Sequence, residues 1–391
     1  MYLKTKLLYV FFFFSFFTFS QVRELKIQIR DLVTDEPIED VTVTILKAGK
    51  SFLSNENGEV SLIIIKKRNI EFSHSLFKSV ILNSDDLKDE LNIVYLDSRV
   101  QQLEEVIITN IHPQEILKEL IKNSKQKLTI PANLKIYLRE FYKRNNQFVF
   151  YNDGLINFQV FGDAKKIETD ILVEQNRRVG FLDKDLSDEV LGYNLNNIIE
   201  NYYQFKYLDE ILSSKAKKQY DFQVKTYPQN ENYLVIKANP INEADGLLSN
   251  FSVLYDATNK IIIEVSAYLS KTRVLLLEEN ESNKIHKLEF KNTFHFEDND
   301  YYLTSSKEVI GFYKKYKKEK RKIEVKNNIV VTNFDRKMFE YSKENVFKDK
   351  SLINKKSTIF TEYWEFDSGL TPTSEEQKII ESLAEAKDSI D

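Results

Sequence analysis

The 391-residue chain contains no cysteine. That absence excludes disulfide bonds, thiolate zinc ligands, cysteine nucleophiles and a lipid-modified cysteine. Glycine and proline are scarce, with 9 and 6 residues, so the turns must rely on Asn and Asp. The formal net charge is only −4, which argues against a dedicated nucleic-acid-binding protein. The sequence also lacks a nucleophile elbow, a phosphate-binding loop and a dinucleotide fingerprint.

The residues that are abundant favour β structure. The chain has 28 Phe and 21 Tyr, and aromatic residues are enriched in strands. Apolar residues make up 42% of the sequence and charged residues 30%, which is typical of a globular protein with substantial cores. The length predicts two or three domains.

The N-terminus carries the pattern of a secretory signal. Lys4 and Lys6 precede an apolar run over residues 7–19, and small residues at Thr18 and Ser20 precede Gln21. The run is shorter than the roughly 20 residues that a membrane-spanning helix needs. We therefore predict a signal peptide over residues 1–20, and export to the periplasm or to an outer-membrane-associated location.

Residues 21–110 read as a seven-stranded β-sandwich. Apolar and polar residues alternate in short runs that are separated by turn residues, including the hairpin signal Asn57-Gly58. The seven predicted strands cover residues 25–29, 41–45, 52–53, 60–64, 70–72, 77–82 and 91–96.

Four segments of this region resemble the carboxypeptidase regulatory-like domain, a transthyretin-like sandwich found in envelope proteins of outer-membrane bacteria. The segments are VTDEPIEDVTV (33–43), SNENGEV (54–60), FSHSLFKSV (72–80) and the exit strand LEEVII (103–108). The resemblance implies an accessory sandwich without catalytic residues. Asp35, Asp40 and Leu76 stand where the family prefers Gly, which puts the turn geometry at those three positions in doubt.

The sequence HPQE at the end of this region has two interpretations. His112 and Glu115 have the spacing of a zinc ligand pair, to which His286 or His295 could add a third ligand. However, Pro113 fits the first position of a helix, and a glutamate in the first turn favours the helix dipole. We therefore predict the start of a helix here, and no metal or cofactor site.

Residues 111–370 are predicted to form an α+β domain that is dominated by a long antiparallel sheet. Helices are expected after residue 112 and within residues 186–217, and a meander packed by helices on its concave face follows from the spacing of the strands. Strands are predicted at residues 136–144, 148–161, 171–179, 221–227, 233–238, 251–256, 261–269, 274–279, 284–296, 301–312, 322–333 and 338–342. The fold class is thus mainly β with an α+β part.

Two further resemblances bear on function. Residues 233–269 are similar to the central hairpins of lipoprotein-carrier half-barrels, whose cavity holds acyl chains. The order of segments, ending in YWE (363–365) and LTPTSEE (370–376), resembles the periplasmic part of envelope proteins that continue into an outer-membrane β-barrel. Residues 371–391 are predicted to form a C-terminal helix, which Thr373 and Glu376 open as a capping box.

One charged run is a candidate for contact with an anionic surface such as lipid phosphates. It comprises Lys314, Lys315, Lys317, Lys318, Lys320, Arg321 and Lys322. The alternative interpretation is a solvated hairpin tip between two strands.

Three functions remain open from the sequence. We expect a non-catalytic, exported cell-envelope accessory protein that acts through a protein, glycan or lipid partner. A periplasmic carrier of a lipid or other apolar ligand is the alternative, and an apolar cavity under the sheet would favour it. A zinc-dependent hydrolase is the third, and it requires His112, Glu115 and a further His to converge.

Overall fold

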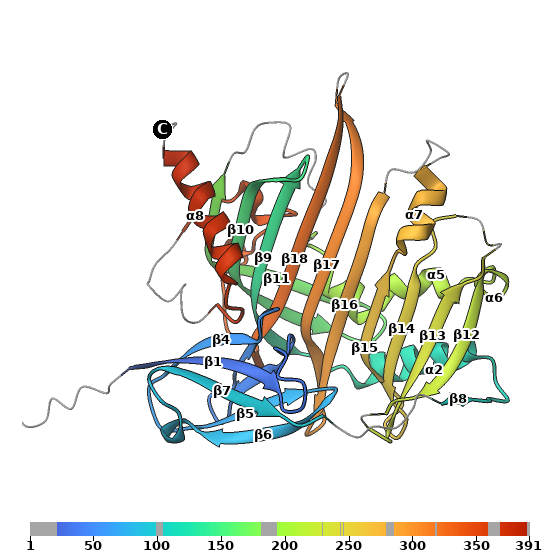
Figure 1. Cartoon of the computed structure of the whole chain (residues 1–391), viewed down its shortest axis with the longest axis horizontal. Helices are drawn as coiled ribbons and strands as arrows, with labels where there is room; N and C mark the ends of the chain where they lie inside the picture. Colours follow the sequence, from blue (N-terminus) through green and yellow to red (C-terminus); the bar gives the residue numbers. More distant parts are fainter. Residues whose placement is uncertain are drawn as a thin grey trace, which may run out of the picture.

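The computed structural model describes residues 22–98, 105–180, 194–278 apart from 229, 243 and 245, 285–316, 319–358 and 368–388. The fold is mainly β, as predicted. A β-sandwich in the N-terminal part lies against one face of a long antiparallel sheet, and helices lie on the other face (Figure 1). The predicted signal peptide over residues 1–20 and the segment around Trp364 lie outside the described residues.

Seven strands form the sandwich, at the positions that the alternation of apolar residues predicts. They are β1 (Arg23–Asp31), β2 (Thr42–Ile45), β3 (Lys50–Leu53), β4 (Glu59–Ile64), β5 (Asn69–His74), β6 (Phe77–Asn83) and β7 (Leu91–Leu96). One sheet has the order β4-β1-β7, and the other runs β6-β5-β2-β3. Inward residues of both sheets, such as Ile27, Val43 and Phe72, form a single buried core.

The long sheet contains eleven strands of the remaining chain, arranged around β18. They are β8 (Val106–Ile107), β9 (Ala132–Arg144), β10 (Gln147–Gly162), β11 (Ile167–Gly180), β12 (Tyr220–Thr226), β13 (Tyr233–Pro240), β14 (Asn250–Asp256), β15 (Ile261–Tyr268), β16 (Ile285–Glu297), β17 (Asp300–Tyr316) and β18 (Glu319–Asp335). Strands β12 to β18 form the predicted meander. Strand β18 pairs with β17 on one side and with β9 on the other, so the β9-β10-β11 hairpins extend the same sheet.

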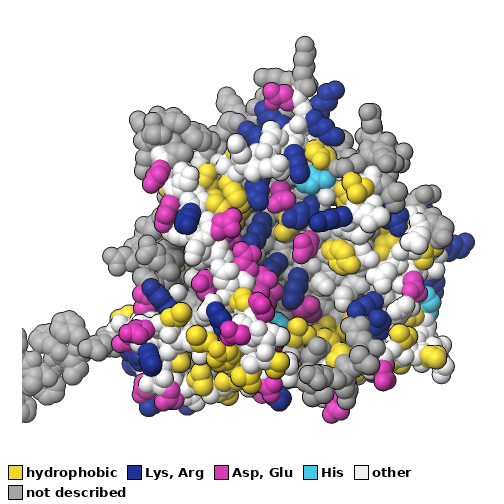
Figure 2. All heavy atoms as spheres, viewed as in Figure 1, with side chains coloured by type: hydrophobic (Ala, Val, Ile, Leu, Met, Phe, Trp, Pro, Cys, Tyr) yellow, Lys and Arg dark blue, Asp and Glu magenta, His cyan; other side chains and the backbone are white. Residues whose placement is uncertain are grey.

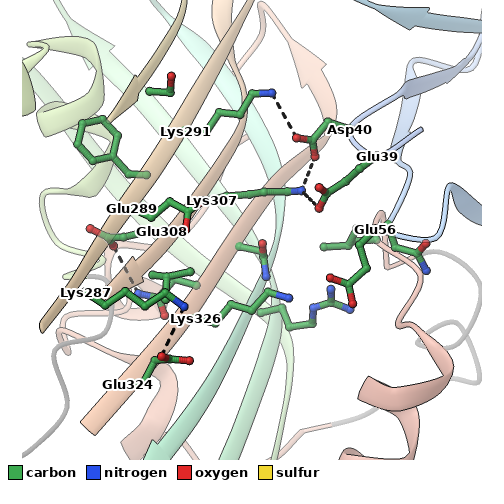
Figure 3. A pocket seen from close by; sticks show the side chains of 18 of the residues that line it. Glu39, Asp40, Glu56, Lys287, Glu289, Lys291, Lys307, Glu308, Glu324 and Lys326 are labelled. Carbon is green, nitrogen blue, oxygen red and sulfur yellow. Dashed lines mark hydrogen bonds and ion pairs between the residues drawn. The ribbon is translucent and has the colours of Figure 1, made fainter. Parts of the chain in front are cut away.

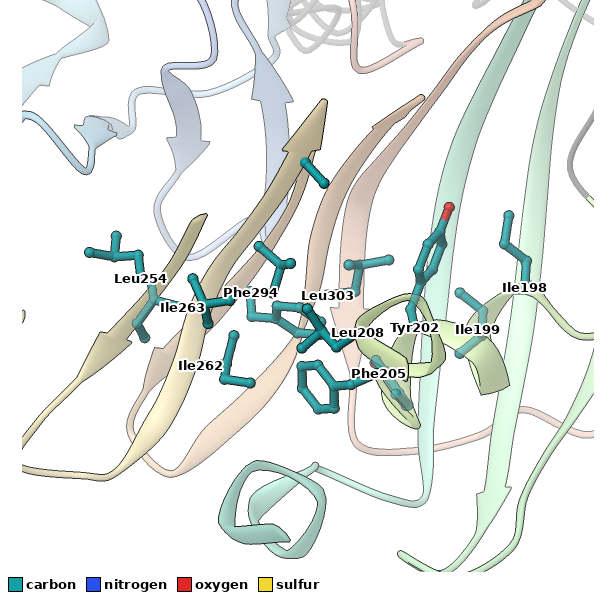
Figure 4. Close-up of a cluster of buried hydrophobic side chains, with 14 of the residues drawn as sticks. Ile198, Ile199, Tyr202, Phe205, Leu208, Leu254, Ile262, Ile263, Phe294 and Leu303 are labelled. Carbon is teal, nitrogen blue, oxygen red and sulfur yellow. The ribbon is translucent and has the colours of Figure 1, made fainter. Parts of the chain in front are cut away.

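Helices cover one face of the sheet, and their side chains pack against the side chains of that face. Helix α2 (Pro113–Lys127) packs on β12 and β15, and α4 (Ile198–Tyr203) packs on β11. The short elements η2 (Lys206–Leu208), α5 (Asp209–Leu212) and α6 (Ala216–Gln219) follow α4. Figure 4 shows the apolar side chains that meet between these helices and the sheet, in the largest buried cluster of the described residues.

The sandwich and the long sheet are joined through β3. Lys50 of β3 pairs with Asn333 of β18, so the second sheet of the sandwich continues into the long sheet. The side-chain amide of Asn333 donates to the carbonyl of Gly49 at 2.9 Å, and Leu53 donates to the carbonyl of Gly369 at 2.8 Å. These bonds fix the position of the sandwich loops over the sheet.

Three predicted elements are corrected by the structure. Residues 106–107 of the expected exit strand pair with β12 of the long sheet and not with the sandwich. Helix α7 (Lys271–Glu278) occupies most of the segment predicted as a strand at 274–279, because a short apolar run fits either element. Residues 338–342, which were also predicted as a strand, contain no strand.

The C-terminal helix α8 (Ser374–Asp388) forms as predicted and lies on the same face as the sandwich (Figure 1). Thr373 and Glu376 form the predicted capping box, with N–H to side-chain distances of 3.1 Å in both directions. Ile380 and Leu383 pack on Phe141 and Tyr151 of β9 and β10. Among the described residues, no helix is long and apolar enough to cross a membrane.

Candidate functional site: a charged cleft on the open face of the sheet

A cleft of about 680 Å³ lies where the sandwich and α8 approach the uncovered face of the long sheet. Strands β9 and β15 to β18 form its floor, the sandwich loops around residues 39–40 and 55–56 form one wall, and the start of α8 forms another. Figure 2 shows that Lys, Arg, Asp and Glu side chains gather over these central strands. The cleft is therefore a polar cavity in a molecule whose other sheet face is apolar.

The pairing of the strands places three basic residues and Asn328 in one line across the floor. Arg139 of β9 lies opposite Asn328 of β18, Asn328 opposite Lys307 of β17, and Lys307 opposite Lys291 of β16. Directly opposed residues point to the same face of a sheet. We call these four residues the cross-strand row. At about 4.8 Å per strand, the row spans about 14 Å across the floor.

The sandwich wall brings carboxylates to one end of the row. Asp40 forms ion pairs with Lys307 and with Lys291, and Glu39 also pairs with Lys307 (Figure 3). Burial raises the pKa of Asp40, but the two lysine charges outweigh it and hold the pKa below its ordinary value. Lys291 has a second partner in Glu264, at 3.3 Å.

The backbone at Asp40 is unusual. Its φ is 65°, in the left-handed region, and Asp35 has a φ of 57°. These are two of the three positions where the family that the sandwich resembles prefers Gly. An L-residue pays roughly 1–2 kcal/mol in this region, although Asp tolerates it better than most residues. At position 40 this backbone conformation carries a carboxylate that contacts two lysines of the cleft.

The start of α8 brings a second carboxylate to the other end of the row. Glu376 Oε2 lies 3.2 Å from Arg139 Nη2, and its Oε1 lies 3.1 Å from Lys326 Nζ. Burial raises the pKa of Glu376, but the charges of Arg139 and Lys326 lower it by more. The same carboxylate accepts from the Thr373 N–H, so the capping box of α8 fixes its position.

Arg139 is the most deeply buried charge of the cleft. Only 2% of the residue is exposed, and its Nε and Nη1 have no hydrogen-bond partner. The side-chain Nδ2 of Asn328, opposite Arg139 in the row, also has none. A buried donor without an acceptor costs about 1–3 kcal/mol, and more when it is charged. Arg139 and Asn328 therefore have three donor nitrogens without partners, and surrounding atoms enclose all three.

Asp153 of β10, which lies opposite Arg139 of β9, is engaged by other side chains. Asp153, with no exposed surface, accepts from Tyr151 Oη at 2.6 Å and from Tyr137 Oη at 3.1 Å. It also pairs with Arg177 at 2.8 Å. Asp153 thus has three side-chain donors of its own.

Glu308 follows Lys307 in β17, and the alternation of the strand turns its side chain to the opposite face, beside Asn327 of β18. Burial raises its pKa to about 7, and a hydrogen bond from Asn327 opposes that effect. The charge of Glu308 consequently changes near neutral pH.

The predicted basic run lies away from this cleft. Lys314 and Lys315 end β17, and Lys320, Arg321 and Lys322 lie at the start of β18, at the tip of the hairpin (Figure 1). None of these five lines the cleft, and Lys317 and Lys318 lie outside the described residues. The described residues on either side of the tip form the predicted hairpin between two strands. Contact of this run with an anionic surface stays a prediction.

The residues of the zinc hypothesis do not meet. His112 is the N-cap of α2, where its Nδ1 accepts from the Gln114 N–H at 3.1 Å, and its ring contacts Phe222 of β12. His286 and His295 lie on β16, four strands from β12, and contact Tyr313 and Tyr302 respectively. Four strand spacings are about 19 Å, far beyond the reach of shared metal ligands.

Metal-binding clusters are also absent from the rest of the described part of the chain. No group of three or more His, Asp or Glu side chains there could hold a metal ion. Glu115, the other half of the apparent zinc pair, forms ion pairs with Lys118 and Lys217 at 3.1 Å. The helix-start interpretation of HPQE is thus confirmed.

Comparisons with known proteins reveal only distant similarity. No family model and no curated protein matches the chain. A structure of lipovitellin, described by its lipid–protein interactions, aligns with 59% of the chain at 11% identity and a TM-score of 0.24, and the chain spans only 29% of lipovitellin. A DUF1329 family protein from Desulfovibrio piger aligns over 56% of this chain and 92% of its own, at 12% identity and a TM-score of 0.25. The MucA/MucB complex of Pseudomonas aeruginosa aligns over 57% and 98%, at 10% identity and a TM-score of 0.19. Similarities at this level support no transfer of function.

Proposed function

We propose that this chain is a non-catalytic binding protein of the cell envelope, which holds a polar ligand in the cleft between the sheet, the sandwich and α8. The observation that carries the proposal is a cavity of about 680 Å³ that is lined mainly by charged side chains, among them Lys291, Lys307 and Lys326. Each of these lysines pairs with a carboxylate of the sandwich or of α8. A polar ligand in the cavity can exchange such contacts for hydrogen bonds of its own.

The fold supports a rigid site. The floor of the cleft consists of long paired strands, and sites on such elements are more precise than sites on loops. The walls are fixed by the bonds between β3 and β18 and by the packing of α8 on β9 and β10. The sandwich therefore serves as a wall of the site, a role that fits an accessory domain of the regulatory-like class.

An apolar ligand fits this structure less well. The face of the sheet that the helices cover is filled by packed side chains such as Phe205, Phe294 and Leu303 (Figure 4). The cleft on the other face is lined mainly by charged residues. We therefore favour a polar ligand over the acyl chain that a lipid carrier would hold.

Export is the part of the proposal that rests on sequence. Residues 1–20 carry the positive start, the short apolar run and the small residues of a secretory signal. The absence of cysteine is compatible with an oxidising compartment in which the packed cores alone supply stability. The predicted location is the periplasm or the periplasmic side of the outer membrane.

Native mass spectrometry of the protein purified from its own cells tests the proposal. Ser266 lines the cleft opposite Lys291, so Ser266→Trp fills part of the cavity, and Ser266→Ala is the matched control. We expect a ligand mass on the wild-type chain and on Ser266→Ala, and its loss in Ser266→Trp. A chain that carries no ligand, or a ligand that Ser266→Trp retains at equal stoichiometry, would overturn the proposal.

A further inference from the structure

We propose that the projecting end of the β17–β18 hairpin docks the protein on an anionic phospholipid surface. The contact is made by one face of the hairpin and of its base, which we call the lysine face. It comprises Lys315, Lys320, Lys322, Lys287 and Lys143. The inference goes beyond the proposed function, because the three outer lysines, Lys315, Lys320 and Lys322, do not line the cleft.

The hairpin extends past the strands on either side of it. Strand β16 pairs with β17 only as far as Phe312, and β9 pairs with β18 only from Ile323 onward. In the described part of the chain, the outer residues of β17 and β18 pair only with each other. Figure 1 shows this end of the hairpin rising above the rest of the sheet. The outer hairpin is therefore placed to reach an extended surface before the body of the protein does.

The alternation of side chains separates the charges of the hairpin between its two faces. Lys315 stands an even number of positions from Lys307, and Lys320 and Lys322 stand an even number from Asn328, so all three share the face of the cross-strand row. Glu319 points to the other face, where its carboxylate lies 4.0 Å from Arg321. Within the described residues of the outer hairpin, the lysine face therefore carries positive charge alone.

Two of these lysines oppose each other directly. Lys315 pairs with Lys320 in the register, and both are exposed. Like charges in this position destabilise an antiparallel pair, whereas opposite charges stabilise it. Among the described residues Lys315, Lys320 and Lys322 form no ion pair, and the Nζ of Lys320 lies over the ring of Tyr313, 4.2 Å from its centroid. Phosphate groups between the two ammonium groups would relieve the repulsion.

Two further lysines extend the lysine face at the base of the hairpin. Lys287 of β16 lies opposite Gly311 of β17, and Lys143 of β9 lies opposite Glu324 of β18. Glu324 lies 3.5 Å from the Nζ of each, and Figure 3 shows Lys287 and Glu324 side by side. In Figure 2 Lys and Arg side chains gather over this end of the sheet. Clusters of about four to eight basic residues are typical of contact with anionic lipids.

The chemistry of the lysine face favours a diffuse phosphate surface over a single bound anion. All five cations are lysines, which act as flexible point charges, and none has the planar fork with which arginine grips one phosphate or carboxylate. The outer lysines stand on a projection, which suits a flat surface. A nucleic acid is disfavoured by the net charge of −4, and the predicted export brings the chain to membrane surfaces.

Flotation of the full chain with lipid vesicles tests the inference. The probes are vesicles of phosphatidylcholine alone and vesicles in which about a third of the lipid is phosphatidylglycerol. We expect the anionic vesicles to bind at least about tenfold more tightly. That binding should weaken as NaCl rises from about 0.05 M to about 0.5 M, because salt screens the charges. Equal binding to both vesicles, or no binding to either, would overturn the inference.

Two variants assign the binding to the hairpin. Lys315→Glu turns the like-charged pair with Lys320 into an oppositely charged pair, so it should not lower the Tm. It should nevertheless weaken binding to anionic vesicles about tenfold, because it changes the charge near the surface by two units. The matched control Lys122→Glu makes the same change at an exposed position of α2, on the other face of the sheet, and should leave binding unchanged. A control that weakens binding as much as Lys315→Glu would refute the docking face.

A soluble polyanion is the competing partner, and a heparin oligosaccharide is its probe. At equal concentrations of negative charge, we expect the wild-type chain to bind the anionic vesicles more tightly than heparin. Tighter binding of heparin would overturn the phospholipid surface in favour of a polymer. Lys315→Glu should also retain the ligand mass that native mass spectrometry detects, so a failure of membrane docking would leave the proposal for the cleft intact.

Discussion

The contact between Glu376 and Arg139 makes a sharp prediction about stability. Glu376→Gln keeps the length of the side chain and its hydrogen bond within the capping box, because Gln serves at this position as well as Glu. It removes the charge that Arg139 and Lys326 face at 3.2 and 3.1 Å. The substitution therefore isolates the electrostatic part of the contact from the start of the helix.

The expected magnitude follows from burial. Arg139 is 2% exposed and Glu376 is 7% exposed, so the variant leaves a guanidinium inside the protein without its carboxylate. Removing one partner of a buried ion pair typically costs 3–5 kcal/mol, and Lys326, being more exposed, adds little. We expect the free energy of unfolding to fall by about 3 kcal/mol at pH 7.

Urea unfolding followed by far-UV circular dichroism measures this difference. The matched control is Glu375→Gln, which removes an exposed carboxylate from the same turn and should change the free energy of unfolding by no more than about 0.5 kcal/mol. The pKa of Glu376 lies below its ordinary 4.5 in the folded chain, so its contribution is present above about pH 4.5 and is lost as the pH falls further. The difference between Glu376→Gln and wild type should therefore shrink in acid.

Two results would refute this reasoning. One is a Glu376→Gln variant as stable as the Glu375→Gln control at pH 7. The other is a loss of stability that does not shrink as the pH is lowered, because a protonated Glu376 is as neutral as the Gln that replaces it. The first would mean that Arg139 is solvated, and the second that the side chain acts through packing.

Three further perturbations test other parts of the structure. The pKa of Glu308 is raised to about 7, so the stability that its neutral form confers is full below about pH 4.5 and is lost as the pH rises through 7. Glu308→Gln should remove that loss. In urea titrations at pH 8 the variant should be about 2 kcal/mol more stable than wild type. Asp40→Asn keeps a residue that tolerates positive φ but loses the ion pairs with Lys307 and Lys291. It should lower the free energy of unfolding by about 1 kcal/mol at pH 7, and by nothing once the pH is low enough to protonate Asp40. A decrease that does not depend on pH would contradict this. Leu120→Ala, on the face of α2 that packs into the core, should cost about 3 kcal/mol by thermal unfolding, and Lys122→Ala on the exposed face should be nearly neutral.

Local patterns were sufficient to predict most strands. The seven strands of the sandwich follow from alternation, which places Ile27 and Ile29 inward and Lys26 and Gln28 outward along β1. The start of α2 follows from Pro113 and Glu115, and the start of α8 from Thr373 and Glu376. These features depend on residues within a few positions of each other, so a sequence can reveal them.

The errors arose where a segment owes its structure to a distant partner. Val106 and Ile107 are apolar and β-prone, but nothing nearby indicates that Val224 of β12, and not the sandwich, is their neighbour. Val274 begins an apolar run that is short enough to suit either a strand or a helix, and tertiary context selects the helix α7.

The cleft could not be predicted for the same reason. Arg139 reaches the cross-strand row only through pairing with Asn328, and Asp40 reaches it only because the sandwich is joined to β18. One local signal was available. Arg139 and Glu140 interrupt the apolar run over residues 136–142 of β9, and both are buried, which marks a position that requires partners.

The central position of β18 has a consequence for how the protein folds. Lys322 of β18 donates to Asn145 at the turn after β9, and 177 residues separate the two. The edge of β9 stays unpaired until β18 forms hydrogen bonds with it. The chain must lose the conformational entropy of closing this long loop before the pairing contributes to stability. Folding should accordingly be slow and should end with the insertion of β18. A transient intermediate would expose an unpaired strand edge, which is the surface that a holding chaperone shields from aggregation.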